Sequence, residues 1–431
     1  MYFSWGDPTM ATAFKQSDDL MAAAREEAFS MPLDKIDVAD GARFVNNTFW
    51  PFFERLRRDA PIHYCADSKF GPYWSVTRYK DIMAVDTNHA IFSSDAHLGG
   101  ITVADMDDDF ILPMFIAMDP PKHDVQRKAV SPIVAPANLA VLEVLIRERA
   151  QKIFDNLPIN EPFDWVDRVS IELTTQMLAT LFDFPWEDRR KLTYWSDIAT
   201  SDPDLPGNPN KEERQLILLE CLQYFTNLWN ERVNAPPAGD LISMMAHDPA
   251  TRDMAPMEYL GNLILLIVGG NDTTRNSMSG AVVAFNRYPD QWAALLADPS
   301  KAAAAAPEII RWQTPLAHMR RTCLTETEVG GQTIRAGDKV LMWYISANRD
   351  EAVFPDAEAF DITRANARRH LSFGFGVHRC VGARLAEIQI QILIEEMVAR
   401  RMTAHITGEP ELAAQSFVHG YMRQPVTLTR G

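Results

Sequence analysis

The sequence predicts a mainly α-helical fold with a minor β portion, and three observations support that class. From Val381 onward, apolar residues recur at three- and four-residue spacing, which is the pattern of an amphipathic helix facing a core. The stretch 260–287 is long and strongly apolar, as expected of a buried helix. Short segments rich in aromatic and β-branched residues are strand candidates instead, at 73–77, 329–334 and 340–346.

Further helices follow from local patterns. Apolar residues at 49–56 with two arginines after them predict an early amphipathic helix. A Pro-Pro pair at 120–121 precedes a helical stretch, because proline is tolerated where the first N–H groups lack a partner anyway. The loop 201–210 carries three prolines and a glycine and separates two helical segments that could form a lid. The alanine run at 302–306 predicts a helix or its lead-in.

Composition limits the classes of function. The chain has 431 residues, 47% of them hydrophobic, so it can bury a sizeable core. Its net charge of −16 disfavours binding to nucleic acid or anionic lipid through charge alone. No run of eighteen uncharged apolar residues occurs, so we expect no transmembrane segment. Residues 1–32 mix charges with alanines and lack a signal peptide's apolar block, which predicts a loosely attached leader to a cytoplasmic protein.

The cysteines indicate one special site. Cys65, Cys221, Cys323 and Cys380 lie far apart without a Cys-x-x-Cys pair, which argues against a zinc site, an iron–sulfur cluster and a disulfide framework. Cys380 alone lies at the start of a predicted helix, where free N–H groups and the helix dipole favour a thiolate. A thiolate at this place is either a nucleophile or a metal ligand.

The glycines around Cys380 favour the metal ligand. Gly374, Gly376 and Gly382 remove side chains on both sides of the sulfur and allow positive φ. A nucleophile does not need that clearance, whereas a haem must lie flat against the loop while the sulfur reaches its iron. We therefore expect Cys380 to be an iron ligand.

A second unusual segment interrupts the apolar helix at 269–276 with the residues Gly-Gly-Asn-Asp-Thr-Thr-Arg-Asn. Two adjacent glycines inside a helix cost about 1 kcal/mol each relative to alanine. A buried acid and two hydroxyl groups also need hydrogen-bond partners. Gly269 and Gly270 would open a groove, and a threonine hydroxyl can bond a preceding carbonyl and distort the helix. The segment therefore predicts a site with room for dioxygen and water.

Residues 373–382, Phe-Gly-Phe-Gly-Val-His-Arg-Cys-Val-Gly, closely resemble the haem-binding loop of the cytochrome P450 superfamily. The resemblance implies one domain over 1–431, with haem between a long oxygen-activating helix and the proximal cysteine loop. It implies that Cys380 is the iron ligand, that Phe373 shields the sulfur and that Gly382 gives the haem room. The residues that it places on the haem propionates are His378, His123, Arg127 and Arg321.

The resemblance extends to two further motifs: the glycine-rich interruption at 269–276 and a Glu-x-x-Arg sequence at 308–311. The glycine-rich interruption resembles the family's Ala/Gly-Gly-x-Asp/Glu-Thr motif, which implies that Thr273 and Asp272 assist oxygen cleavage and proton delivery. Glu308-x-x-Arg311 resembles the family's structural ion pair. That pair usually has a third partner, an arginine, but Ala359 stands at its expected position, so Arg349 or Arg364 is the candidate replacement.

The family's recognition regions imply the walls of a narrow slot for a small hydrophobic substrate. The run 269–278, together with the residues that lead into the cysteine loop, resembles the bacterial subgroup that hydroxylates the terminal carbon of medium-chain alkanes and fatty acids. Terminal C–H bonds are stronger than internal ones, so attack there must be enforced by positioning. The expected wall residues are Ile101, Val103, Phe110, Met114, Leu265, Val268, Gly269, Leu316, Met319 and Phe417.

The resemblance also implies haem b (iron protoporphyrin IX), O2 and electrons from NAD(P)H. The chain has no dinucleotide-binding Gly-x-Gly-x-x-Gly in a βαβ context, no flavin region and no cluster cysteines, which implies a ferredoxin and a ferredoxin reductase as partners. Arginines near the thiolate loop suggest either ordinary surface charge or a docking patch for an acidic donor: Arg364, Arg368, Arg369, Arg379 and Arg384.

Three other functions stay open at this stage. A monooxygenase for a terpenoid, sterol or macrolide would oxidise a ring or an internal carbon. A non-catalytic haem protein for gas sensing or electron transfer would not need the proton relay that Asp272 and Thr273 suggest. A hydrolase would use Cys380 as its nucleophile without haem.

Overall fold

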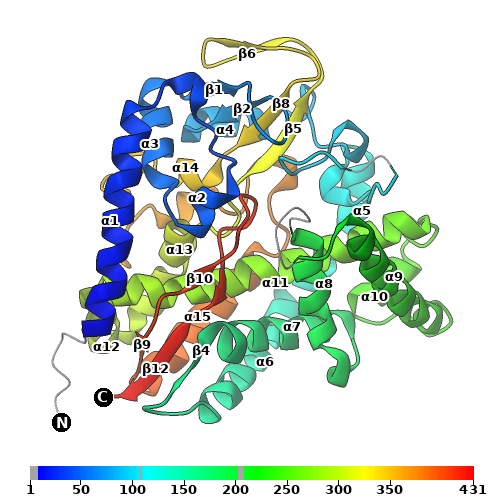
Figure 1. Ribbon diagram of the computed structural model, residues 1–431. Helices are drawn as coiled ribbons and strands as arrows, with labels where there is room; N and C mark the ends of the chain where they lie inside the picture. Colours follow the sequence, from blue (N-terminus) through cyan, green and yellow to red (C-terminus); the bar gives the residue numbers. More distant parts are fainter. Residues whose placement is uncertain (1–7, 107–108, 202–207) are drawn as a thin grey trace.

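The computed structural model describes residues 8–106, 109–201 and 208–431. Helices dominate it, and the sheets are small (Figure 1). The α-helices are α1 (Pro8–Ser30), α2 (Gly41–Val45), α3 (Trp50–Asp59), α4 (Tyr79–Asp86), α5 (Lys122–Val130), α6 (Pro136–Asp155), α7 (Glu172–Phe182), α8 (Arg190–Thr200), α9 (Lys211–Val233), α10 (Leu241–His247), α11 (Pro256–Arg287), α12 (Pro289–Ala297), α13 (Ala302–Gln313), α14 (Tyr344–Ala347) and α15 (Ala383–Ala399). The strands are β1 (Ile62–Cys65), β2 (Tyr73–Val76), β3 (Phe92–Ser93), β4 (Pro162–Asp164), β5 (Met319–Cys323), β6 (Thr327–Val329), β7 (Gln332–Ile334), β8 (Lys339–Met342), β9 (Met402–Ile406), β10 (Glu411–Leu412), β11 (Tyr421–Arg423) and β12 (Pro425–Arg430). The mainly α class with a minor β portion is confirmed.

The largest sheet has the strand order β1-β2-β8-β5-β3 and brings together distant parts of the chain. Strands β2 and β8 are parallel, with Trp74 opposite Val340, and the other pairs in this sheet are antiparallel. This sheet lies at the top of Figure 1, whereas the helices α6 to α10 gather on the other side of α11. A second sheet, β4-β12-β9, ties the C-terminal segment to the helices.

Helix α11 runs through the middle of the molecule (Figure 1) and is 32 residues long. It packs against α7, α8, α9, α12, α13 and α15, which explains why its sequence is apolar on nearly every side. Pro256 stands in its first turn, where proline fits. The helix expected at 260–287 is therefore confirmed, and it begins one turn earlier than the apolar run.

Several expected elements are found, and two strands differ. The early helix is α3, the alanine run opens α13, and the segment after the two prolines is α5. The strand expected at 329–334 is wrong: Gly330 and Gly331 have φ of 55° and 82° and form the turn of the β6–β7 hairpin. The strand expected at 340–346 ends at Met342, and α14 follows it.

The expectation of a loosely attached leader is wrong for the part of 1–32 whose side chains are described. Helix α1 packs along α3 (Figure 1), and Ala28 is fully buried between them. Arg25 forms an ion pair with Glu54 of α3 at 2.5 Å. A helix with one small-residue face can lie close to a neighbour although its sequence is rich in charge.

The loop expected at 201–210 falls between α8 and α9, and residues 202–207 of it lie outside the described residues. Over the described ranges, no single helix has the length and apolar composition needed to cross a membrane, and only the bent pair 122–134 and 136–155 meets that test together.

Candidate active site

A cavity of about 710 Å³ lies between α11 and the loop that precedes α15. The structure brings all ten expected wall residues to it, from the segments at 101–114, α11, the loop after α13, β5 and the C-terminal region. Cys380, Phe373, His378, Gly382, Arg127, Arg321, Asp272 and Thr273 line the same cavity. Residues separated by hundreds of positions in the sequence therefore share one chamber.

Cys380 faces this cavity three residues before α15 begins. Its backbone N–H donates to the Phe373 carbonyl at 2.8 Å, which closes the loop around the sulfur. Burial raises the pKa of the Cys380 thiol, whereas the backbone N–H groups of Gly382 and Ala383 and the guanidinium of Arg127 act in the opposite direction. The backbone N–H groups at the helix start favour the thiolate form as expected, but burial, which is the larger effect, favours the thiol.

The glycines of the loop have more than one task. Gly374 and Gly376 have φ of 64° and 68°, in the left-handed region that favours glycine. A Cβ on Gly376 would lie 2.5 Å from the Asp86 carbonyl oxygen, so this glycine makes room for α4 rather than for the cavity. The positive φ expected at Gly382 is wrong, since its φ is −85°, but a Cβ there would lie 4.0 Å from the Cys380 sulfur.

Asp86, at the end of α4, anchors the loop, although no local sequence pattern indicates this role. Its carboxylate accepts hydrogen bonds from the Phe375 backbone N–H at 2.8 Å and from the Tyr344 hydroxyl at 2.9 Å. It also forms a buried ion pair with Arg321 at 2.8 Å. Arg321 lines the cavity as expected, but a carboxylate of the protein already compensates its charge.

On α11, the two adjacent glycines differ in role. A Cβ on Gly269 would meet no atom within 4 Å, so Gly269 opens the cavity as expected. A Cβ on Gly270 would lie 2.7 Å from a methyl carbon of Leu178, so the second glycine allows α7 to pack closely. The Thr273 hydroxyl donates to the Gly269 carbonyl at 3.3 Å, the bond to a preceding carbonyl that the sequence predicts.

Asp272 is buried and held by several donors. Its Oδ1 accepts hydrogen bonds from Ser196 at 2.9 Å and Asn271 at 2.8 Å, and Arg275 lies 3.3 Å from the same oxygen. The other oxygen, Oδ2, accepts a long bond from Thr200 at 3.5 Å. Oδ2 is therefore the less occupied of the two carboxylate oxygens. Neither Ser196 nor Thr200 carried a sequence signal, because hydroxyl residues in helices are common.

Arg275 links this carboxylate to the neighbouring helix. Its guanidinium also pairs with Asp197 of α8 at 2.9 Å. Burial raises the pKa of Asp197, and the nearby Arg275 opposes that effect. The buried cation thus serves two carboxylates, and it fixes α8 against α11 beside the cavity.

Four contacts help to position the wall that Ile101, Val103, Phe110 and Met114 form, which we call the loop wall. At its far end, Gly261 of α11 faces Pro113, whose carbonyl oxygen would lie 2.2 Å from any Cβ at position 261. The Phe115 N–H donates to Asn262 Oδ1 at 2.9 Å. Near its start, Asp105 pairs with the buried Arg320 at 2.5 Å and with Lys339 at 3.2 Å.

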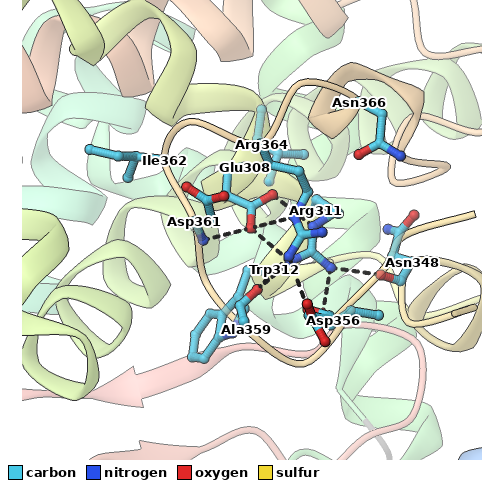
Figure 2. Close-up of polar contacts among 12 residues, drawn as sticks. Glu308, Arg311, Trp312, Asn348, Asp356, Ala359, Asp361, Ile362, Arg364 and Asn366 are labelled. Carbon is cyan, nitrogen blue, oxygen red and sulfur yellow. Dashed lines mark hydrogen bonds and ion pairs between the residues drawn. The ribbon is translucent and has the colours of Figure 1, made fainter.

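Glu308 and Arg311 do not line the cavity; they lie in α13, fully buried and paired at 2.7 Å. Figure 2 shows the loop 356–362 folded around this pair. Arg311 donates to the backbone carbonyls of Asn348, Ala357 and Ala359. These bonds hold the chain that leads toward the cysteine loop.

Comparisons with known proteins agree with this geometry. The family description "Cytochrome P450" matches residues 302–411. Linalool 8-monooxygenase of Pseudomonas putida is 34% identical over 92% of this chain and 99% of its own. A methyl-branched lipid omega-hydroxylase of Mycobacterium tuberculosis is 32% identical over 91% of both chains. The chain belongs to the cytochrome P450 family.

Solved structures of P450 enzymes superpose on this P450 over most of its length. CYP153D17 from Sphingomonas sp. has a TM-score of 0.87 and 53% identity, covering 93% of this chain and 100% of its own. Cytochrome P450-153 from Novosphingobium aromaticivorans has a TM-score of 0.86 and 48% identity, covering 91% of this chain and 99% of its own. Membership in the family implies that this P450 works with haem, O2 and electrons from redox partners.

The residues of this P450 fit a haem on grounds of their own. The cavity passes between Cys380 and Gly269, so a flat group can lie between the sulfur and α11. His378 donates to or accepts from the Ser94 hydroxyl at 3.0 Å through Nε2, and its Nδ1 is buried without a partner among the residues described. Burial, and next the charge of Arg321, lower the pKa of His378 to about 2. A bound carboxylate would satisfy the orphaned nitrogen.

His123 and Arg127 are the remaining expected haem contacts. His123 is buried, its ring centroid lies 4.3 Å from that of His378, and its Nε2 has no partner among the residues described. It packs behind His378 and is not itself among the residues that line the cavity. Arg127 lines the cavity and donates to the Arg379 carbonyl at 2.5 Å, which leaves further N–H donors for a propionate.

Proposed function

We propose that this P450 hydroxylates the terminal carbon of medium-chain alkanes or fatty acids. The observation that carries the proposal is the lining of the cavity: apolar side chains from five separate segments line the same chamber as Gly269, Thr273 and Cys380. An unbranched chain could be held along such walls with one end at the open position beside Gly269. The omega-hydroxylase relatives and the two similar P450-153 structures support the same reading.

Haem, when bound, supplies the activation of dioxygen and the oxidation of the C–H bond. The overall reaction joins R–H, O2, two electrons and two protons to give R–OH and water. The task of the chain is to hold the reacting C–H bond in place and to deliver two protons without admitting bulk water. An internal methylene reacts more easily than a terminal methyl. Oxidation of the terminal methyl therefore requires that the substrate is held in one fixed position.

Thr273 and Asp272 are the proposed proton donors of this P450. The Thr273 hydroxyl faces the cavity and can give a proton to a bound ligand while its oxygen accepts another. Asp272 Oδ2, the less occupied oxygen, would replace that proton. Ser196, Asn271 and Arg275 keep the carboxylate in one orientation, so the relay does not need to reorganise at each turnover.

We propose a ferredoxin and an NAD(P)H-dependent ferredoxin reductase, in the cytoplasm of the source bacterium, as the electron supply. Of the arginines considered for docking, Arg364 is not available, because it is buried against Glu308. Arg368 and Arg384 have 57% and 60% of their side chains exposed and share Glu387. Arg379 is exposed beside Cys380. We therefore propose a smaller docking patch, formed by Arg368, Arg379 and Arg384 around the cysteine loop.

The deciding experiment is reconstituted turnover with octane and, separately, with a medium-chain fatty acid, followed by analysis of which carbon carries the hydroxyl. The proposal expects mainly the terminal alcohol or the ω-hydroxy acid. Predominantly subterminal products would refute terminal selectivity. The reduced protein under carbon monoxide should show the strongly red-shifted absorption of thiolate-ligated haem, and Cys380→Ala should abolish it.

One relative favours a second candidate, the oxidation of a terpenoid. Linalool 8-monooxygenase is a curated relative of this chain at 34% identity, and its name states a terpenoid alcohol as its substrate. Linalool should therefore be included in the same turnover assay. Faster product formation from linalool than from linear chains would replace the first proposal, whereas oxygen consumption without any organic product would favour a non-catalytic haem protein.

A further inference from the structure

The lining of the cavity includes a polar corner. It lies where α8 ends and α9 begins, and the cavity residues there include Thr200, Ser201, Lys211, Arg214 and Gln215. Helix α9 packs against α8, α10 and α11, whereas α15, which follows Cys380, packs against α6, α11 and α13. The polar corner and the sulfur are thus held by different groups of helices, and α11 packs against both groups.

Arg214 is one of the two basic residues that line this corner, together with Lys211. It is half-buried in the first turn of α9. Its Nε donates to the Ile198 carbonyl at 3.1 Å and its Nη2 to the Ala199 carbonyl at 2.6 Å. These two bonds fix the guanidinium against the C-terminal end of α8, where unpaired carbonyl groups attract positive charge.

Arg214 lacks a carboxylate partner among the residues described, and burial alone lowers the pKa of its guanidinium. Two other arginines line the cavity. Arg321 pairs with Asp86, whereas Arg127 donates to the Arg379 carbonyl beside Cys380, where a haem propionate is expected. Removing a cation from water without a counter-charge is unfavourable, so a group that brings a negative charge into this corner would be stabilised.

The remaining donors of Arg214 suit one kind of anion. A guanidinium has five N–H donors in a planar fork, and these two bonds leave Nη1 and one N–H of Nη2 without a partner among the described residues. These donors lie on the edge of the fork that matches the two oxygens of a carboxylate. An alkane has no hydrogen-bond acceptor for these N–H groups.

We propose that Arg214 binds the carboxylate of a medium-chain fatty acid and thereby directs the methyl end of the chain toward Thr273. The inference rests on the proposed terminal hydroxylation and narrows its substrate class from hydrocarbons in general to linear carboxylic acids. With the acid group held at the polar corner, the apolar walls receive the chain, and the carbon farthest from the carboxylate enters the space beside Gly269.

The test compares ligands of equal length that differ only at the head: dodecanoic acid, dodecan-1-ol and dodecane. Their affinities for the haem-loaded enzyme are measured by the change in haem absorption and by calorimetry, in the wild type, Arg214→Gln and Arg214→Lys. Arg423→Gln is the matched control, since Arg423 is exposed and pairs with Glu411 on the surface.

For Arg214→Gln we expect the affinity for dodecanoic acid to fall about 10- to 100-fold, the usual effect of losing a charge-assisted hydrogen bond, with less than about threefold change for the alcohol. Arg214→Lys keeps the charge and should retain part of the preference. Raised salt should weaken binding of the acid in the wild type more than in Arg214→Gln.

Equal losses for acid and alcohol would show that Arg214 only caps α8 and would overturn the inference. So would a wild type that binds acid no better than alcohol, a result that does not depend on the folding of any variant. A selective loss of acid affinity together with subterminal products would leave the role of Arg214 intact and refute terminal selectivity instead.

Discussion

Arg364 pairs with Glu308 at 3.2 Å and takes the place of the arginine expected where Ala359 stands. Its Nη2 donates to the Ala359 carbonyl at 3.1 Å (Figure 2). Arg364 lies four residues after Phe360 in the sequence, whereas the expected arginine would directly precede this phenylalanine. Arg349, the other candidate, pairs with Glu358 instead. The buried network is therefore complete with a different residue in its third position.

Because Glu308 and Arg311 are fully buried, removing one charge leaves the other uncompensated. We expect Glu308→Gln to lower the free energy of unfolding by about 3–5 kcal/mol, as for other broken buried ion pairs. Urea denaturation of the haem-loaded protein measures it. The control is Glu358→Gln, whose side chain is 67% exposed, with an expected change of about 0–1 kcal/mol. Equal effects of the two substitutions would contradict the prediction.

Thr273→Ala should uncouple electron use from product. The hydroxyl that we propose as a proton donor is lost while the walls are kept, so the ratio of alcohol formed to NAD(P)H consumed should fall several-fold and hydrogen peroxide should rise. Thr273→Ser keeps a hydroxyl and should restore most of the coupling. Unchanged coupling in Thr273→Ala would remove the threonine from the proton relay.

Asp105 should control where the substrate is oxidised without being part of the chemistry. Asp105→Asn removes the charge that pairs with Arg320 and Lys339, so the loop wall loses its ion pairs with β5 and β8 and keeps only its backbone contacts there. We expect more subterminal product from the same fatty acid, measured by chromatography, with haem content unchanged. Asp253→Asn, at an exposed ion pair, is the control. An unaltered product distribution would show that the wall is held by packing alone.

His318 should make the protein sensitive to mild acid. It is fully buried, donates through Nδ1 to the Ser416 carbonyl at 2.9 Å, and burial lowers its pKa from 6.5 to about 4. Since the unfolded chain binds the proton more readily, stability falls as the pH drops below 6.5, and the loss levels off below pH 4.

The size of this effect follows from the two pKa values. At pH 5 the loss from His318 amounts to about 2 kcal/mol relative to pH 7.5. His318→Gln should therefore show a flatter dependence of its denaturation midpoint on pH, whereas the exposed His97→Gln should follow the wild type. Parallel curves for His318→Gln and the wild type would contradict the assignment.

Sequence reasoning found the parts of the site that carry their signal locally. Cys380 with its glycines, and the Gly269–Thr273 segment, are unusual in the residues themselves, because each breaks a rule of ordinary helices. The ten wall residues were found through the resemblance, and the fold brings them to one cavity. The missed hairpin at Gly330 and Gly331 did have a signal, since a Gly-Gly pair between short strands is typical of a tight turn.

The partners of these residues could not be found in the same way. Asp86 lies 235 positions from Arg321, and only the packing of α4 against the sheet brings them together. Ser196 of α8 holds Asp272 of α11 through a contact between the two helices, for which an ordinary serine gives no hint. Local patterns identify reactive groups, whereas the groups that orient them depend on tertiary packing.

Gly261 has a consequence for the evolution of substrate range. The space that its missing side chain leaves is filled by the Pro113 carbonyl, so the distance between α11 and the end of the loop wall is set by a residue that touches no substrate. Selection could therefore enlarge or reshape the chamber through a single added methyl group at this contact. Catalogues of specificity residues restricted to the lining of the chamber would overlook such a change.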